Sequence, residues 1–296
     1  MKSSPRAHAI RLAILFFLAL SASVRLSAAP PDATSRDHKF KMHLTGTIEG
    51  TGENPMNVSS DVEIRYTWSV NGNERKLRYD AMSVKVKVDG NESLNISMSR
   101  DKYVAVTNGK TTEIDAAHAP QGLKDMLAGN FENPLCSLTV DKDGAETDRR
   151  IVAVGAGKSL VESGGIINGL LFHPPFMQGQ TQWESPKQIS LGNGGSADGK
   201  LKFEAAAPKD GKVAVGVSGT LTNDEYVAKG NPIVQKNIRD EITGTETYDL
   251  ALREWVSGTL NINGSAELFA KGKRVGTMKA TMKAEFERLN EDRAKP

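Results

Sequence analysis

Apolar and polar side chains alternate one by one along most of this 296-residue sequence. This period of two is typical of a β-strand with one buried and one hydrated face. Within residues 58–70 the even positions hold most of the apolar side chains, namely Val58, Val62, Ile64, Tyr66, Trp68 and Val70. The run from Met278 to Phe286 repeats the pattern, with lysine, threonine and glutamate between the apolar positions. We therefore expect antiparallel strands that form a sheet with one face in water.

Tight-turn signals separate the alternating runs. Asn71-Gly72, Asp89-Gly90 and Asn108-Gly109 are dipeptides typical of two-residue hairpin turns. Short connections favour an up-and-down meander, and sheets of this length normally close, split or curl. The predicted fold class is mainly β: a long antiparallel meander sheet curled into an open or closed barrel, in a single domain over residues 38–289.

The middle of the chain departs from alternation. Residues 119–129 carry apolar side chains on one side of a helix and end in Gly129, which predicts a short helix. A second helix is predicted over residues 159–171, although this segment contains three glycines. Residues 233–242 fit either a third helix or an irregular strand. We therefore expect one to three short helices inserted mid-chain.

The first 29 residues predict export. A basic lead with Lys2, Arg6 and Arg11 precedes an apolar run over residues 12–20, and small residues follow. This order is typical of a secretory signal peptide, and the apolar run is about half of the ~20 residues that a membrane-spanning helix needs. We therefore expect a periplasmic or extracellular protein without a transmembrane span, soluble once the leader is removed.

The sequence also predicts which ends of the mature chain are flexible and where its one cysteine lies. Residues 30–37 and 290–296 are predicted to be flexible tails. No cysteine stands directly after the leader, so a lipoprotein is not expected, and the single Cys136 excludes an intramolecular disulfide. Cys136 shares its parity with Leu138 and Val140, which predicts a buried position on a strand.

The charge balance disfavours nucleic acid as a partner. The chain contains 38 basic and 36 acidic residues, and residues 1–29 hold four of the basic and none of the acidic ones, which leaves 34 against 36. A nearly neutral protein has no field that would gather phosphate backbones.

No motif with catalytic or cofactor chemistry is complete. Residues 155–159 read Gly-Ala-Gly-Lys-Ser, but Val152 occupies the first glycine position of a phosphate-binding loop. Residues 141–144 lack the spacing of an EF-hand calcium loop. His38 and His43 have opposite parity and must point to opposite faces of one strand. We therefore expect no catalytic residues, no metal site and no cofactor.

The candidate ligand contacts are apolar. One group shares the inward parity of the sheet, and its methionines suit a variable ligand. The other lies in residues 170–177, an apolar segment in which Pro174 and Pro175 prevent a regular strand or helix. This loop either plugs one end of the curled sheet or lines an apolar opening. The predicted contacts are Tyr66, Trp68, Met82, Met98, Leu171, Phe172 and Phe176.

Two motifs carry a family resemblance. Residues 174–183 read Pro-Pro-Phe-Met-x-Gly-x-x-x-Trp, and a closing hairpin runs through Lys271-Gly272-Lys273 into residues 278–286. Over residues 36–289 this pattern resembles an uncharacterised family of secreted bacterial β-rich proteins. The resemblance implies no activity and no residue roles. A looser analogy is to curled-sheet carriers of lipids in the bacterial envelope.

Two functions are compatible with these features. The first is a non-enzymatic binding protein that holds an apolar small molecule, a lipid or an envelope component on the inner face of the sheet. The alternative is a structural or interaction module of a cell-surface assembly, without a ligand cavity and with an unknown protein partner.

Overall fold

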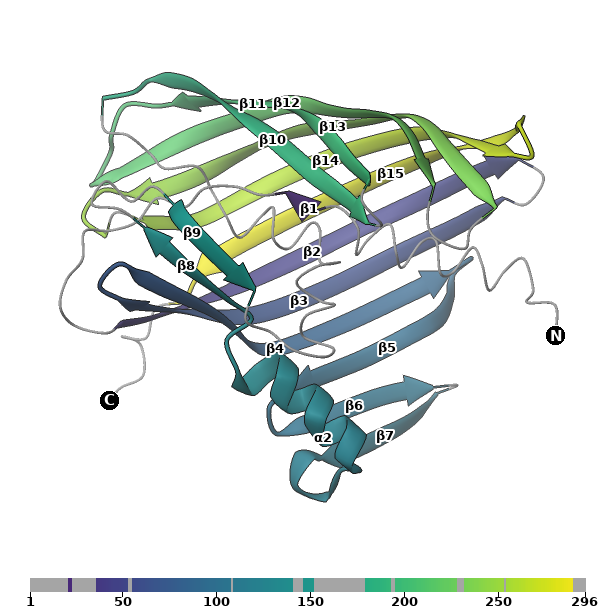
Figure 1. Cartoon of the computed structure of the whole chain (residues 1–296), viewed down its shortest axis with the longest axis horizontal. Helices are drawn as coiled ribbons and strands as arrows, with labels where there is room; N and C mark the ends of the chain where they lie inside the picture. The colour runs from purple at the N-terminus through teal and green to yellow at the C-terminus, as the bar shows by residue number, and fades with distance from the viewer. Residues whose placement is uncertain are drawn as a thin grey trace.

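The computed structural model describes residues 21–22, 36–52, 55–107, 109–140, 146–151, 179–192, 195–227, 232–252 and 254–289. These residues form one strongly curled 15-stranded antiparallel sheet and one short helical segment (Figure 1). The predicted mainly β meander is therefore confirmed.

The sheet contains two meanders that meet in its middle. The first comprises β2 (Arg36–Gly52), β3 (Met56–Asn71), β4 (Glu74–Val88), β5 (Asn91–Ser99), β6 (Lys102–Thr107) and β7 (Lys110–Asp115). The second comprises β10 (Gln182–Gly192), β11 (Gly195–Ala205), β12 (Lys212–Val227), β13 (Ile233–Asp249), β14 (Glu254–Ala270) and β15 (Lys273–Arg288). β15 pairs antiparallel with β2. The Oγ1 atoms of Thr47 and Thr281, which are 234 positions apart in the chain, therefore lie 2.8 Å from each other.

The sheet forks at β4. Glu74–Leu77 pairs with β8 (Cys136–Val140), whose hairpin partner is β9 (Glu146–Ile151), whereas Ala81–Val88 pairs with β5. Between the two branches run a 3₁₀ turn (Ala116–His118), the helix α2 (Gln121–Leu127) and a π-type turn (Ala128–Glu132). The helix predicted over residues 119–129 therefore forms.

The sheet is open. β7 forms one edge, and the two-residue β1 (Ser21–Ala22), paired with β10, forms the other. Within the described residues the edges do not pair with each other, so the closed alternative is wrong. β2 begins at Arg36, so the last two residues of the predicted flexible segment 30–37 belong to the sheet.

Residues 233–242 are strand, not helix. They begin β13, and its register with β14 shifts between Lys236 and Arg239. Asn237 lies inside this bulge with φ at 51°, which explains why the sequence pattern looks irregular there. The helix predicted over residues 159–171 lies outside the described residues.

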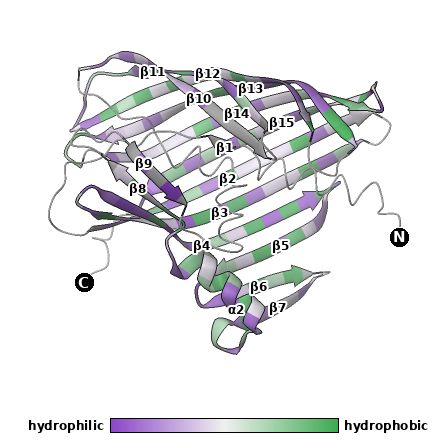
Figure 2. Cartoon of the chain, viewed as in Figure 1, coloured by the Kyte–Doolittle hydropathy of each residue, from purple (hydrophilic) through white to green (hydrophobic). Residues whose placement is uncertain are grey.

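The two faces of the sheet differ in polarity, which Figure 2 shows as alternating hydropathy along the strands. One face, called the inner face here, carries the buried apolar side chains of a single core cluster. A bulge changes which residues of β4 face inward. Met82, at an even position, is buried on one side of the register shift opposite Arg65 and Tyr66, and Tyr79 and Leu77, at odd positions, are buried on the other. The outer face carries partly exposed ion pairs such as Lys41–Glu63 and Lys283–Glu285. Among the described residues, no helix combines the length and the apolar character needed to cross a membrane.

Candidate functional site

Four of the predicted contact residues lie together on the inner face. Met82 of β4 pairs with Met98 of β5 and with Ile64 of β3, and Tyr66 and Trp68 follow on β3. Each of the four predicted side chains is at most 7% exposed. With Phe40 of β2 they form a continuous surface, which we call the aromatic–methionine patch: Phe40, Tyr66, Trp68, Met82 and Met98.

The patch is ordered by ring stacking. The rings of Phe40 and Tyr66 lie 5.2 Å apart and within 8° of parallel, on paired positions of β2 and β3. Offset stacking of this kind contributes roughly 0.5–1.5 kcal/mol beyond burial. The remaining predicted contacts, Leu171, Phe172 and Phe176, lie outside the described residues and stay predictions.

Charged side chains border the patch, and sequence reasoning did not predict them. His38 Nδ1 lies 2.7 Å from Glu254 Oε1, and Arg288 Nη1 lies 3.4 Å from Glu254 Oε2. Arg75 is buried, and the charge of Glu254 acts on it as well. We call these four residues the Glu254 cluster: His38, Arg75, Glu254 and Arg288.

The curl of the sheet brings this cluster together. Arg75 on β4 interacts electrostatically with Glu254 and with Tyr248 on β13. β13 and β4 are five strands apart in the sheet order, which at about 4.8 Å per strand corresponds to roughly 24 Å in a flat sheet. At the end of the sheet that holds Glu254, the curl therefore brings β4 and β13 close enough for their charged side chains to interact.

Burial shifts the pKa values of two residues in and beside the cluster. It raises the pKa of Tyr66 well above its usual range, and the charge of Glu254 acts in the same direction. Burial lowers the pKa of Arg75, and Glu254 partly opposes that shift. The Tyr66 hydroxyl therefore keeps its proton and can donate a hydrogen bond.

The inner face of β13 holds two further acids, Asp240 and Glu246, both at most 2% exposed. Burial raises the pKa of Asp240 to about 7. Asp240 Oδ2 makes no hydrogen bond to the described residues, and Oδ1 lies over Gly264, where a Cβ would come within 2.6 Å. The sequence signal that could have identified both acids is their position: each stands where the alternation calls for an apolar side chain.

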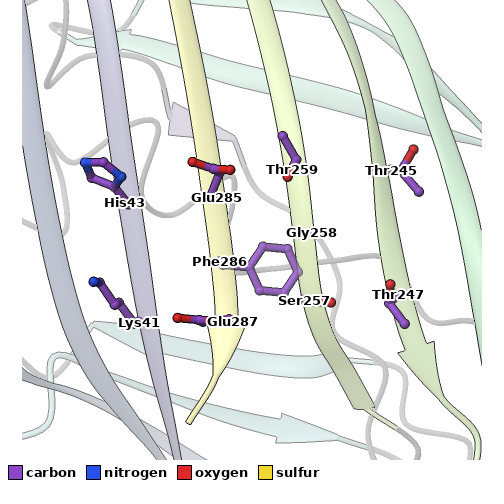
Figure 3. A pocket seen from close by; sticks show the side chains of 10 residues that line it. All are labelled: Lys41, His43, Thr245, Thr247, Ser257, Gly258, Thr259, Glu285, Phe286 and Glu287. Carbon is purple, nitrogen blue, oxygen red and sulfur yellow. The ribbon is translucent and has the colours of Figure 1, made fainter.

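A separate, shallow polar groove of about 470 Å³ lies on the outer face. Figure 3 shows its lining of two rows of side chains from β2, β13, β14 and β15. Three of its lining residues have partners on the same face: Lys41 binds Glu63, His43 Nε2 lies 3.0 Å from Asp61, and Glu285 binds Lys283. These partly exposed, neutralised pairs are those of a hydrated sheet surface.

His38 and His43 point to opposite faces, as predicted, since their partners are Glu254 and Asp61. The described residues contain no group of three or more histidine, cysteine, aspartate or glutamate side chains placed to hold a metal ion. Cys136 is buried on β8, which confirms the prediction for this residue.

Neither a family model nor a curated protein matches the sequence, in agreement with the resemblance to an uncharacterised family. Among solved structures, lipovitellin, described for its lipid–protein interactions, is similar with a TM-score of 0.49 and 10% identity, over 86% of this chain and 25% of that chain. Pseudomonas aeruginosa OpdQ is similar with a TM-score of 0.24 and 5% identity, over 86% and 99% of the two chains. This chain thus spans a quarter of the lipovitellin chain, and the similarities assign it no function.

Proposed function

We propose that this protein binds an apolar or amphipathic molecule, such as a lipid, on the inner face of its sheet and catalyses no reaction on it. The observation that carries the proposal is the contrast between the two faces. The inner face carries a single cluster of buried apolar side chains that extends over most strands of the sheet, and the outer face carries ion pairs such as Lys41–Glu63 and Lys283–Glu285. A curled sheet with this polarity keeps water outside and offers an apolar interior.

The composition of the inner face supports an adaptable lining. Five of the nine methionines are buried there: Met42, Met82, Met98, Met278 and Met282. The unbranched thioether side chain can change rotamer at low cost, so such a surface can repack around ligands of different shape. Met82 and Met98 face each other across β4 and β5, directly beside the aromatic rings of the patch.

Fluorescence quenching by a brominated acyl chain tests the proposal. The chain has three tryptophans, and a variant with Trp183→Phe and Trp255→Phe leaves Trp68 as the single reporter. We expect the brominated chain to quench Trp68, and we expect native mass spectrometry to detect bound lipid after gentle purification. Absence of both quenching and bound lipid would contradict the proposal.

Methionine variants locate the site. Met82→Ala and Met98→Ala should each weaken acyl-chain binding several-fold, because they remove contact surface from the patch. Met278→Ala is the matched control, because Met278 is equally buried on the inner face but lies on β15, where it pairs with Gly50. Equal losses in all three variants would indicate a general packing defect instead.

We infer further that the protein is exported. The leader-like residues 1–29 support this proposal. Cleavage after this segment would remove β1 and leave β10 as the edge of the sheet. Cell fractionation with N-terminal sequencing of the mature protein tests it, and an intact N-terminus in a cytoplasmic fraction would contradict it.

One observation favours the alternative, an interaction module. β7 is an edge strand whose side chains from Lys110 to Glu113 are all exposed, and within the described residues it pairs with β6 alone. Exposed edges can accept a strand from another chain. Cross-linking from a cysteine placed by Thr112→Cys would recover one stoichiometric protein partner if this alternative holds, and no such partner if it fails.

A further inference from the structure

Asp240 is a buried acid that lacks a hydrogen-bond donor. It stands on the inner face of β13, is 1% exposed, and its Oδ2 accepts no hydrogen bond from the described residues. Arg239, the cation next to it in the sequence, lies on the outer face, 3.0 Å from Glu241. A buried carboxyl group without a hydrogen bond destabilises the folded state, and a donor placed against it would remove that cost. Asp240 therefore has the chemistry of a contact point for a donor.

The paired strands do not supply this donor. On the inner face, the residues paired with Asp240 and with its neighbours Ile238 and Ile242 are Leu221, Gly219 and Asn223 on β12 and Gly264 and Ile262 on β14. Asn223 alone of these has a polar side chain, and its amide nitrogen donates to the backbone oxygen of Ser196. The next ionisable residue on this face of β13 is Glu246. Within the part of the chain that the structure describes, Asp240 thus has neither a donor nor a countercharge.

Short side chains lie beside the carboxyl group on β14 and β15. Asp240 Oδ1 lies over Gly264, 2.6 Å from the position that a Cβ would take there. Gly264 pairs with Ala280 on β15, and Ala266 is the next buried residue along β14. None of these three residues has a side-chain atom beyond Cβ, so a ligand group can approach the sheet closely at this point. We call this region the Asp240 site: Asp240, Gly264, Ala266 and Ala280.

We propose that the Asp240 site binds the hydrogen-bond donor of an otherwise apolar ligand, a hydroxyl or a primary amino group, while the rest of the ligand lies on the inner face. This inference rests on the proposed function and names the polar group of its ligand. Carboxyl oxygens accept hydrogen bonds from both groups. An ammonium group also brings the countercharge that an ionised Asp240 needs, and the hydrogen bond between two charged groups is the stronger one.

Three ligands with the same alkyl chain test the site: a primary amine, an alcohol, and a methyl ether that offers no donor. Isothermal titration calorimetry measures their affinities for the protein. We expect the amine or the alcohol to bind at least about tenfold more tightly than the ether, the effect of one hydrogen bond to a sheltered carboxyl group. The ratio between amine and alcohol identifies which donor the site prefers.

Variants of Asp240 assign the contact. Asp240→Leu removes both oxygens, so it should abolish the preference for the amine and the alcohol and leave binding of the ether unchanged. Asp240→Asn keeps one acceptor oxygen without the charge, so it should weaken binding of the amine far more than that of the alcohol. This second variant keeps the test valid if Asp240→Leu disturbs the packing over Gly264. Glu246→Gln is the matched control, because Glu246 is a comparably buried acid on the same face of β13.

The affinity for the amine should also rise with pH. The partner of the ammonium group is the ionised carboxylate, and burial raises the pKa of Asp240 to about 7. The ionised fraction therefore rises from about a tenth at about pH 6 to about nine tenths at about pH 8, while an alkylammonium group with a pKa of about 10 keeps its charge. We expect the affinity for the amine to increase about tenfold over this range in the wild type and to stay constant in Asp240→Asn.

The outcomes separate this inference from the proposed function. Equal binding of amine, alcohol and ether would overturn the Asp240 site and leave the apolar site standing. A preference that survives in Asp240→Leu, or that Glu246→Gln removes as well, would do the same. Failure of all three ligands to bind would overturn both. A loss of ether binding in the two Asp240 variants, equal to their loss of amine binding, would also overturn the site, since that pattern indicates a structural role.

Discussion

The side chains of His38 and Glu254 meet at the end of β15, with Nδ1 and Oε1 2.7 Å apart, although 216 positions separate them in the chain. Arg288, the last residue of β15, makes the second contact to the same carboxylate at 3.4 Å. Glu254 therefore ties β14 to β15 and β2, at the end where the curl also brings Arg75 of β4 into its field.

Removal of this carboxylate should destabilise the protein. Glu254→Gln removes the charge of the carboxylate that contacts His38 and Arg288 and that acts on the buried Arg75, and we expect the free energy of unfolding to fall by about 2–4 kcal/mol. Urea denaturation followed by circular dichroism measures the change. Glu63→Gln is the control, because its partner Lys41 lies on the hydrated outer face, and it should cost less than about 1 kcal/mol. Equal losses in both variants would refute a special role for Glu254.

Asp240 should make stability depend on pH. Burial raises its pKa to about 7, so the folded protein holds the proton more tightly than the unfolded chain does. Its stabilising contribution is therefore complete below about pH 4 and is lost as the pH rises through about 7. Asp240→Asn should remove this dependence, and the variant should gain on the wild type between about pH 5 and pH 8 in urea denaturation. Parallel profiles of wild type and variant would contradict the prediction, and the exposed Asp224→Asn serves as the control.

Gly258 should not tolerate a side chain. A Cβ at this position would overlap the ring of Phe286 on β15 and come 3.0 Å from Glu246 Cγ on β13. We expect Gly258→Ala to cost about 1–3 kcal/mol of folding free energy. Gly216→Ala is the matched control, because its Cβ would meet no atom closer than 3.8 Å. Partial recovery in Gly258→Ala combined with Phe286→Leu would confirm the overlap, and equal stability of both alanine variants would refute it.

The bulge in β13 should depend on the left-handed backbone of Asn237, whose φ is 51°. Asn237→Val should lower the unfolding free energy by about 1–2 kcal/mol, because a β-branched residue is strained in this region. Asn237→Gly relieves the strain but loses the exposed 2.8 Å hydrogen bond to Glu267, so it should change stability little. Thermal unfolding distinguishes the two, and similar losses in both variants would assign the effect to the hydrogen bond instead.

The alternation of side chains and the turn dipeptides in the sequence predicted much of the fold. Alternation identified the strands that hold Phe40, Tyr66, Met82 and Phe286, and their side chains are buried as predicted. The turn dipeptides marked real hairpins, since Asp89 and Gly72 both have positive φ at the turns between paired strands. In the candidate site, the sequence predicted the apolar patch but none of the charged residues beside it.

The sequence did not predict Arg75 and Glu254 as site residues, and the physical reason is the same for both. Arg75 and Glu254 stand next to other charged residues in the sequence, where a charge usually indicates a hydrated face. A bulge opposite Arg65 and Tyr66 turns Arg75 to the same face as Leu77, and such a one-residue shift leaves no clear sequence signal.

By itself the sequence determined the period of the chain, and with it the strands, the polarity of their two faces and the apolar character of the interior. The tertiary structure alone decided that β15 pairs with β2, that the sheet forks at β4 and stays open, and that Glu254 faces His38, Arg75 and Arg288. The reason is that alternation is set by the geometry of neighbouring residues, whereas pairing between distant strands and the curl of the sheet depend on the packing of the whole inner face.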